Sequence, residues 1–202
     1  MKVEWLGLSC FKIISGGASV VLDPFTGVRG YGEVHTTAGL ALKSHDHGDH
    51  AFLAGVTLQK EPENVFSIQK YASFHDDVGG KKRGPNTIHV IEAEGKRVAH
   101  LGDLGHLPDE KLIEALKGVD VLLIPVGGFF TIDAKTAKKI AEEIAPKAIV
   151  PMHYKLGECG HEVIGTLDEF LKLYDASQVT RLEENAFEVG AYSGVVVPTF
   201  KG

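Results

Sequence analysis

A seven-residue run at positions 44–50, Ser-His-Asp-His-Gly-Asp-His, constrains this chain more than any other feature. Three histidines and two aspartates fall within six consecutive positions, after an apolar run at 40–42 that predicts the end of a buried strand. Imidazole and carboxylate together suit a borderline divalent cation such as zinc, and also manganese or iron. Adjacent side chains cannot all converge on one ion, so the pattern favours two ions and a sharp turn at Gly48.

Two other structures for this run are less favourable. A helix is disfavoured because glycine in a helix interior costs about 1 kcal/mol relative to alanine. A solvated polar loop is the plainer alternative, but clusters of this density are specific as metal-binding motifs. The run therefore predicts a metal site.

Composition limits the class of protein. A chain of 202 residues, 44% of them hydrophobic, suits one domain spanning 1–202 with a real core. The net charge of −6 and the lack of a strongly basic segment argue against a nucleic-acid groove. Cys10 and Cys159 are the only cysteines, which favours a reduced compartment. Residues 1–11 read as a first strand, and no apolar run nears the roughly 20 residues that span a bilayer. We therefore expect a cytoplasmic protein without a membrane partner.

The apolar pattern predicts short strands in the first half and alternating strands and helices in the second. Strands are expected at 3–6, 11–14, 19–23, 40–44, 121–126, 148–151, 178–182 and 186–190, with a hairpin at 87–92 and 97–101. Helices are expected at 108–116, with Pro108 near the first position, and at 134–144, capped by Asp133. A third helix should run to 174 from a capping box of Thr166 and Glu169. This order indicates an α/β or α+β fold with mixed sheets.

The HxHxDH pattern at 45–50 resembles the signature of the metallo-β-lactamase-fold hydrolases. The phrases LDPF, SFHDD, RGPNT, HLGDLGH, IPVGG and PMHY extend the resemblance from about Trp5 to Tyr154. They are most similar to a small branch of metal-dependent hydrolases that includes relatives of the ascorbate-6-phosphate lactonase. The resemblance implies a four-layer αββα sandwich of two mixed β-sheets with external helices. It also implies ligands outside the motif, and His75, Asp103 and His153 stand in the expected order.

The resemblance further implies two sets of ligands that share one carboxylate: His45, His47 and His75 for one ion, Asp49, His50 and His153 for the other, and Asp103 as the bridge. Two Zn²⁺ ions are expected, with Mn²⁺, Fe²⁺ or Ni²⁺ as alternatives. Two such ions can hold a hydroxide that attacks an ester, lactone or phosphodiester bond. The expected activity is thus that of a dinuclear metal-dependent hydrolase.

Catalytic roles are expected of Asp49, Asp103 and His106. Besides binding metal, Asp49 can orient a water molecule or shuttle its proton. His106 can contact the substrate or donate a proton to a leaving group, or it can simply start the following helix. Asp23 either supports a metal-bound imidazole or is a turn residue before proline. His161 gives a weak signal for a further metal site.

Two connections and two other histidines complete the expectations. Residues 127–133 lead from a buried strand into a helix. Their two phenylalanines should line the pocket, and the helix start can bind an anion; the alternative is core packing. The loop 76–85 should form a mobile lip whose Lys81-Lys82-Arg83 run attracts a carboxylate or phosphate, unless it is a solvated turn. His89 and His100 alternate within strands and should be structural.

Three classes of function remain, with the hydrolase preferred. One alternative is a redox or dioxygenase-type metalloprotein on the same fold, although oxygen-reducing diiron relatives carry a glutamate where His47 stands here. The other is a non-catalytic metal-binding protein, which the complete ligand set argues against. We expect a small-molecule substrate, and bound metals would let the acidic protein accept an anionic one. An oligomer is compatible with the sequence.

Overall fold

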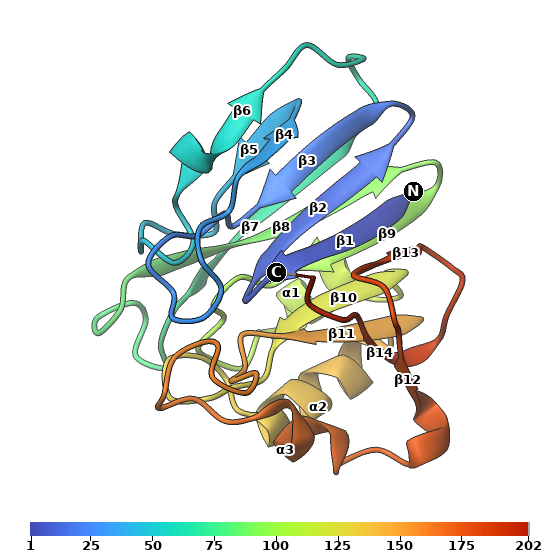
Figure 1. The fold of residues 1–202 in the computed structure, drawn as a ribbon. Coiled ribbons are helices and arrows are strands. Elements are labelled where there is room, and N and C mark those ends of the chain that lie inside the picture. Colours follow the sequence, from blue (N-terminus) through green and yellow to red (C-terminus); the bar gives the residue numbers. More distant parts are fainter. Residues whose placement is uncertain (202) are drawn as a thin grey trace.

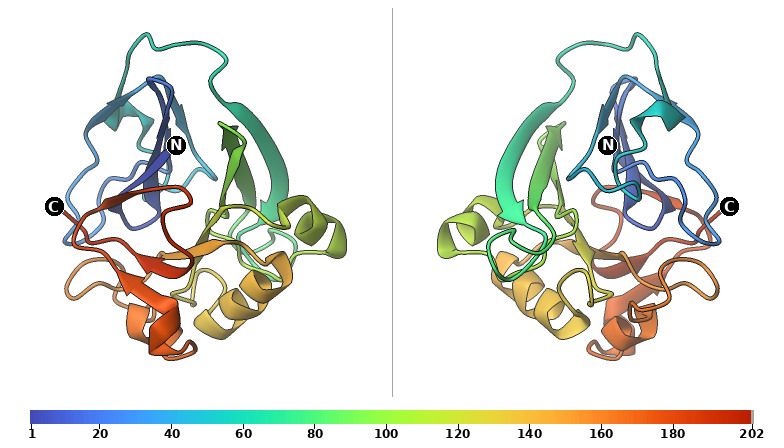
Figure 2. Two further views of the ribbon diagram at one scale, coloured as in Figure 1. Left: turned by 90° about the vertical axis from the view of Figure 1, so that its right-hand side faces the viewer. Right: turned by 90° about the vertical axis from the view of Figure 1, so that its left-hand side faces the viewer.

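Two β-sheets packed face to face form the body of the protein, in a computed structural model that describes residues 1–201 (Figures 1 and 2). The strands are β1 (Lys2–Gly7), β2 (Cys10–Ser15), β3 (Ala18–Leu22), β4 (Thr36–Ala38), β5 (Leu40–Leu42), β6 (Val56–Leu58), β7 (Ser67–Phe74), β8 (Pro85–Ala93), β9 (Lys96–His100), β10 (Val121–Pro125), β11 (Ala148–Met152), β12 (Val179–Arg181), β13 (Ala186–Glu188) and β14 (Gly194–Val197). One sheet has the order β13-β1-β2-β3-β5 and the other β12-β14-β11-β10-β9-β8-β7, while β4 pairs with β6. Both large sheets are mixed, as expected.

Strands β1, β2 and β3 form an antiparallel meander with an apolar inner face and an outer face that is partly apolar. Because side chains alternate along a strand, Trp5, Ile13 and Leu22 enter the core between the two sheets. Cys10 and Val21 point to the opposite side, into a second apolar cluster. The five-stranded sheet therefore needs cover on its outer face as well.

The helices do not provide that cover. They are α1 (Glu110–Leu116), α2 (Ala134–Ile144) and α3 (Leu167–Leu171). Helix α2 packs on β10 of the seven-stranded sheet, with α1 and α3 beside it (Figure 2). The outer cluster of the five-stranded sheet is completed by loop and short-strand residues such as Phe25, Tyr31, Val34 and Val56. The sandwich of two mixed sheets with external helices is confirmed, but the outer layer on this side consists of loops and short strands.

The second half of the chain follows the predicted pattern, except that β14 was not expected and the third helix ends at Leu171 and not at 174. Strands β10 and β11 are buried throughout, because they are central in a sheet with both faces covered. The carboxylate of Asp133 caps α2 by accepting from the N–H of Thr136 at 2.8 Å. At the start of α3, the Glu169 side chain accepts from the N–H of Thr166 at 3.3 Å. No helix within residues 1–201 combines the length and hydropathy needed to cross a membrane.

Three other elements also differ from the expectation. Helix α1 begins after Asp109, whose carboxylate accepts from the N–H of Leu112 at 2.8 Å, so Pro108 lies before the cap. Strand β5 is an edge strand and not a buried one, with Leu40 37% exposed. The eight-residue strand β7 was not predicted at all. It is the edge of the seven-stranded sheet, and its mostly exposed polar residues lack an apolar alternation.

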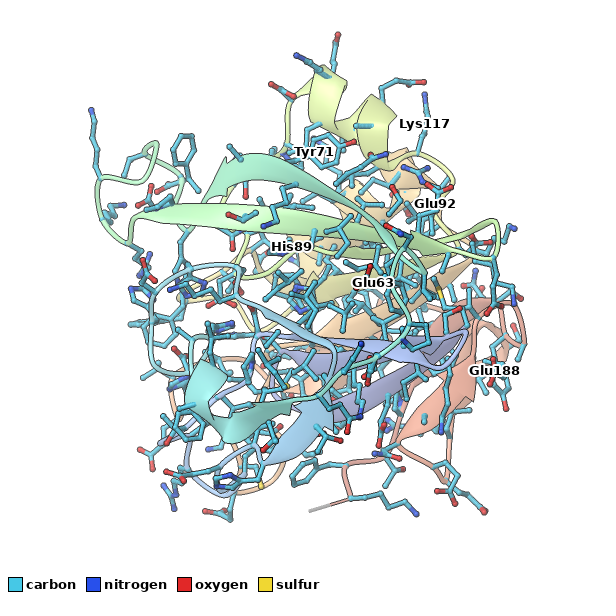
Figure 3. The ribbon with its side chains drawn as sticks, turned by 90° about the horizontal axis from the view of Figure 1, so that it is seen from above. Glu63, Tyr71, His89, Glu92, Lys117 and Glu188 are labelled. Carbon is cyan, nitrogen blue, oxygen red and sulfur yellow. The ribbon has the colours of Figure 1, made fainter. Side chains whose placement is uncertain are left out.

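His89 of β8 and His100 of β9 face each other between the sheets. They are register partners and almost fully buried, and Figure 3 labels His89 in the layer between the sheets. His100 Nε2 lies 2.8 Å from the carbonyl oxygen of Ser9, and its Nδ1 accepts from the N–H of Gly102 at 3.1 Å. Burial and the neighbouring His100 lower the pKa of His89 to about 4. This placement matches the structural role expected of both.

The substitution His89→Leu should reduce the loss of stability in acid. The pKa of His89 is about 4 in the folded protein and about 6.5 in an unfolded chain, so the unfolded chain binds the proton first as the pH falls. For this residue the free energy of unfolding should drop by about 2 kcal/mol between pH 7.5 and 5. Urea unfolding of EDTA-treated protein at both pH values measures this drop. An equal drop in the variant and the original protein would contradict the prediction.

Candidate metal centre

Four of the candidate ligands follow strands. His75 comes directly after β7 and His153 directly after β11, while His45 and Asp103 stand three residues after β5 and β9. Strands β9, β10 and β11 are parallel, and β7 runs in the same direction because it is antiparallel to β8, which is antiparallel to β9. The carboxyl ends of β7, β9 and β11 therefore meet at one edge of the sandwich (Figure 1).

The motif at 45–50 folds as a turn in which the N–H of His50 donates to the carbonyl oxygen of His47 at 3.0 Å. Gly48 has no positive φ, and a Cβ there would meet no atom within 4 Å. The expectation that this turn requires glycine was therefore wrong. The strained positions lie elsewhere. Asp23 and His153 have φ values of 50° and 52°, a conformation that costs a non-glycine residue on the order of 1–3 kcal/mol. Both carry side chains of the site.

The buried carboxylate of Asp103 lies at the centre of the candidate ligands. Its Oδ1 is 3.2 Å from His50 Nε2, and its Oδ2 is 3.2 Å from His75 Nε2 and 3.3 Å from His153 Nε2. His45 Nε2 is 4.0 Å from Oδ2. Burial by itself raises the pKa of Asp103, but His153 and His50 outweigh it and hold this pKa well below its usual range. Histidines from three separate segments thus face one carboxylate.

Several of these atoms are buried without a hydrogen-bond partner among the described residues. They are Nε2 of His45, His50 and His153, and Oδ1 of Asp103. Leaving such an atom unsatisfied costs about 1–3 kcal/mol. Ligands held about 2.0–2.1 Å from a tetrahedral zinc ion stand roughly 3.3–3.4 Å apart, close to the 3.2 and 3.3 Å separations around Asp103. The donor set and its spacing therefore fit divalent metal ions.

The structure brings the first predicted set together. Ligand atoms of His45, His47 and His75 lie within 4.8 Å of one another. His45 and His75 are buried, whereas His47 is exposed, so one member of the set borders solvent. Burial and the neighbouring His50 lower the pKa of His45 to about 4. The ring of His45 is therefore neutral near pH 7, as a metal ligand must be.

The second predicted set is joined by a residue that the sequence signalled only weakly. Ligand atoms of Asp49, His153 and His161 lie within 4.8 Å of one another, and His161 Nε2 is 3.0 Å from Asp49 Oδ2. His50, predicted for this set, has its Nε2 3.8 Å from Asp49 Oδ2. Because 112 positions separate His161 from Asp49, no local spacing reveals their contact.

Asp23 supports two histidines of the motif from behind. Its Oδ2 is 2.8 Å from His50 Nδ1 and accepts from Ser44 Oγ at 2.6 Å, and that hydroxyl is 2.9 Å from His45 Nδ1. Burial acts to raise the pKa of Asp23, but the charge and hydrogen bond of His50 outweigh it and leave the pKa below its usual value. An ionised Asp23 fixes a proton on Nδ1, so the unpaired Nε2 of each ring can face a metal. Asp23 therefore orients two candidate ligands and is more than a turn residue.

Five of the candidate ligands line a cavity of about 270 Å³, and its other lining residues are Arg83, Phe130 and His161. The rings of Phe130 and His161 are 5.4 Å apart, and the Arg83 guanidinium lies over the Phe130 ring. Phe130 thus forms an apolar wall of the pocket, as expected. Phe129 does not line the cavity and is 63% exposed.

The start of α2, where an anion site was expected, already carries a negative group. The carboxylate of Asp133 already accepts from the N–H of Thr136 there, at 2.8 Å. A second negative group there would be repelled by this carboxylate. The connection at 127–133 contributes to the pocket through Phe130 and not through the helix terminus.

His106 lies away from the cavity, and the catalytic role expected of it has no geometric support. Its Nε2 accepts from the N–H of Phe74 at 3.2 Å, and its Nδ1 is 2.8 Å from the carbonyl oxygen of Leu107. The ring lines a different cavity beside α1. Proximity in sequence was misleading, because these hydrogen bonds hold the His106 ring against the backbone at Phe74 and Leu107 and not in the cavity.

Comparisons with known proteins agree with this fold. The sequence profile of the β-lactamase superfamily domain matches residues 2–153. A UPF0173 metal-dependent hydrolase from Thermus thermophilus is 34% identical, in a match that covers 76% of this chain and 84% of that protein. A crystal structure from Thermotoga maritima, whose name proposes a Zn-dependent hydrolase of the metallo-β-lactamase superfamily, is 34% identical with a TM-score of 0.78 and covers 99% of both chains.

More distant structures share the fold. One from Parabacteroides distasonis is 17% identical, with a TM-score of 0.69, and covers 98% of this chain and 93% of that one. The profile match, the relatives and the two-sheet architecture lead to one assignment. The chain belongs to the β-lactamase superfamily, in its metallo-β-lactamase fold.

The variants His75→Ala and His153→Ala should each lose a different metal ion. His75 belongs to the group with His45 and His47, and His153 to the group with Asp49, so each change removes a ligand from one set. Each variant should bind about one equivalent of zinc fewer, because a site that loses one of its few ligands holds the ion much more weakly. Elemental analysis gives the number, and crystal structures of the zinc-treated variants show which ion is missing.

A suitable control is His106→Ala, which removes a nearby histidine that lies outside the cavity. It should keep the metal content of the original protein. Loss of the same ion in the His75 and His153 variants would contradict the division into two sets.

Proposed function

We propose that the protein is a metal-dependent hydrolase that uses two divalent ions to cleave an ester, lactone or phosphodiester bond of a small molecule. Zinc is the first choice, with manganese, iron or nickel as alternatives. Asp103 bridges the ions in this proposal, with two ligand sets on either side: His45, His47 and His75, and Asp49, His50 and His153. When bound, such ions supply Lewis acidity and a water that is deprotonated near neutral pH.

The surroundings of the Asp103 carboxylate are the main support for this proposal. The two oxygens of Asp103 face Nε2 atoms of His50, His75 and His153 at 3.2 to 3.3 Å. Even so, Oδ1 and two of these nitrogens are left without hydrogen bonds. A carboxylate and histidines arranged only for packing would pair with one another. Ligand atoms gathered in groups within 4.8 Å of one another support a bridged pair of ions.

The chain's own residues would position the reaction. Asp49 is the carboxylate best placed to orient an attacking water or accept its proton, because it lines the cavity beside the proposed bridge. Its Oδ2 pairs with His161 Nε2 at 3.0 Å, which fixes the orientation of the carboxylate. Asp103 acts mainly by holding both ligand sets together. Phe130 covers part of the cavity and limits the access of bulk water.

The cavity and the cysteines bear on substrate and location. A cavity of about 270 Å³ is near the lower end of the range for small-molecule sites, which starts at roughly 300 Å³, so we propose a small substrate. Cys10 and Cys159 are both free thiols, which suits the reducing cytoplasm. The cytoplasmic location stays a prediction.

Replacing the bridge tests this function directly. Asp103→Ala should lower the occupancy of both ions and reduce kcat/KM by more than about 100-fold, because even residues that only support a ligand are worth 10- to 100-fold. Zinc content and hydrolysis of 4-nitrophenyl acetate, γ-thiobutyrolactone and bis(4-nitrophenyl) phosphate should be measured on the same samples.

The matched control is Asp46→Ala, which removes a carboxylate of the same motif that is 86% exposed and pairs with Lys43. It should keep both ions and the original turnover. Two tightly bound ions with full activity in Asp103→Ala would show that the bridge is wrongly assigned.

A further inference from the structure

Arg83 is the one permanent cation that lines the cavity over the metal ligands within residues 1–201. Its Nη2 donates to the carbonyl oxygen of Phe129 at 3.0 Å, and its Cζ lies 5.6 Å from the centroid of the Phe130 ring. No acidic side chain in the described part of the chain pairs with this guanidinium. A guanidinium has five N–H donors, so most of them are left for another partner.

The backbone of Arg83 is held as firmly as its side chain. The carboxylate of Asp76 accepts four backbone N–H groups, from Val78, Gly80, Lys82 and Arg83, at 2.8 to 2.9 Å. Burial acts to raise the pKa of Asp76, but these four donors hold it below its usual range. Because Asp76 directly follows the ligand His75, the loop is tied to the metal site. It was expected to be a mobile lip, and it is instead folded around one carboxylate.

The two neighbouring lysines do not share this position. Lys82 Nζ pairs with Asp77 at 3.2 Å, and both side chains are more than half exposed. Lys81 is exposed as well. Neither lysine lines the cavity. The run of three cations expected to attract substrate thus contributes one cation, Arg83, to the pocket itself.

Charge balance then indicates what occupies the space between Arg83 and the ligands. Two divalent ions outweigh the negative charges of Asp49 and Asp103, so a loaded site is positive and faces a positive guanidinium. Like charges in a partly buried cavity repel strongly, and an anion between them removes that cost. A planar guanidinium fits an oxyanion with two parallel hydrogen bonds.

We propose that Arg83 is a specificity-determining residue that binds a carboxylate or phosphate group on the substrate. The substrate is then a small anionic ester, lactone or phosphodiester, with its charged group against Arg83 and Phe130 and its scissile bond at the metal ligands. This inference rests on the proposed hydrolase function for the position of the scissile bond. The anion site itself rests on the contacts of Arg83.

Hydroxamates test the anion site separately from the hydrolase function, because they bind metal ions and are not cleaved like the ester substrates. Zinc-loaded protein should be titrated calorimetrically with acetohydroxamate, which has no charged arm, and with succinate monohydroxamate and 3-phosphonopropanohydroxamate, which carry a carboxylate and a phosphonate. The protein should bind at least one charged probe more tightly than the neutral one. Arg83→Gln should reduce this preference by about 10- to 100-fold, the value of a hydrogen bond to a charged group. The better of the two charged probes identifies the oxyanion.

Two further variants make the test specific. Lys82→Gln removes an adjacent cation that points away from the cavity and should keep the original preference. Arg83→Lys keeps the positive charge but lacks the planar guanidinium, so it should keep part of the preference for the charged probe. Zinc content is measured for each variant, so that a lost metal ion is not mistaken for a lost anion site.

The outcomes distinguish this inference from the proposed function. No preference for either charged probe, or an unchanged preference in Arg83→Gln, would overturn the role of Arg83. An equal loss in Lys82→Gln would also overturn it, because the effect would then be that of general charge. If the preference depends on Arg83 but no ester, lactone or phosphodiester is hydrolysed, the anion site stands and the hydrolase function fails.

Discussion

The structure depends most on one buried carboxylate, that of Asp103. Removing a carboxylate from water is costly unless it is paired, and here its oxygens face histidines on three segments without satisfying all of them. The arrangement makes sense if divalent ions complete it. The positions of the strand ends, the hydrogen bonds behind His45 and His50, and the turn at 45–50 all bring unpaired Nε2 atoms to this carboxylate.

Two residues beside the Asp103 site have strained backbone conformations that lower the stability of the fold. Asp23 and His153 have left-handed backbone conformations with φ of 50° and 52°, which cost energy that the surrounding core must offset. That core lies between two sheets and contains large buried side chains such as Trp5, Phe11 and Tyr154. The two-sheet sandwich thus holds loops with strained backbone and with polar atoms that lack hydrogen bonds. Metal binding would recover part of this conformational and desolvation energy.

Local patterns predicted much of the fold and part of the site. The cap at Asp133 and the hairpin around Glu94-Gly95 depend on neighbours in sequence, and both occur in the structure. The motif histidines were recognisable because one turn carries them. Strand β7 was missed because an exposed edge strand has little apolar alternation.

Contacts between distant segments were harder to predict. His161 reaches Asp49 across 112 positions, so its local sequence signalled the site only weakly. The run at 81–83 indicated a group of cations near the pocket, but the loop wound around Asp76 decides that Arg83 alone lines it. His106 shows the opposite error, because closeness to Asp103 in sequence did not place it in the pocket.

The most direct test of the bridge at Asp103 is anomalous X-ray scattering from crystals grown with zinc. We expect two strong peaks about 3.5–4 Å apart, one on either side of the Asp103 carboxylate. A single peak, or peaks away from Asp103, would contradict it.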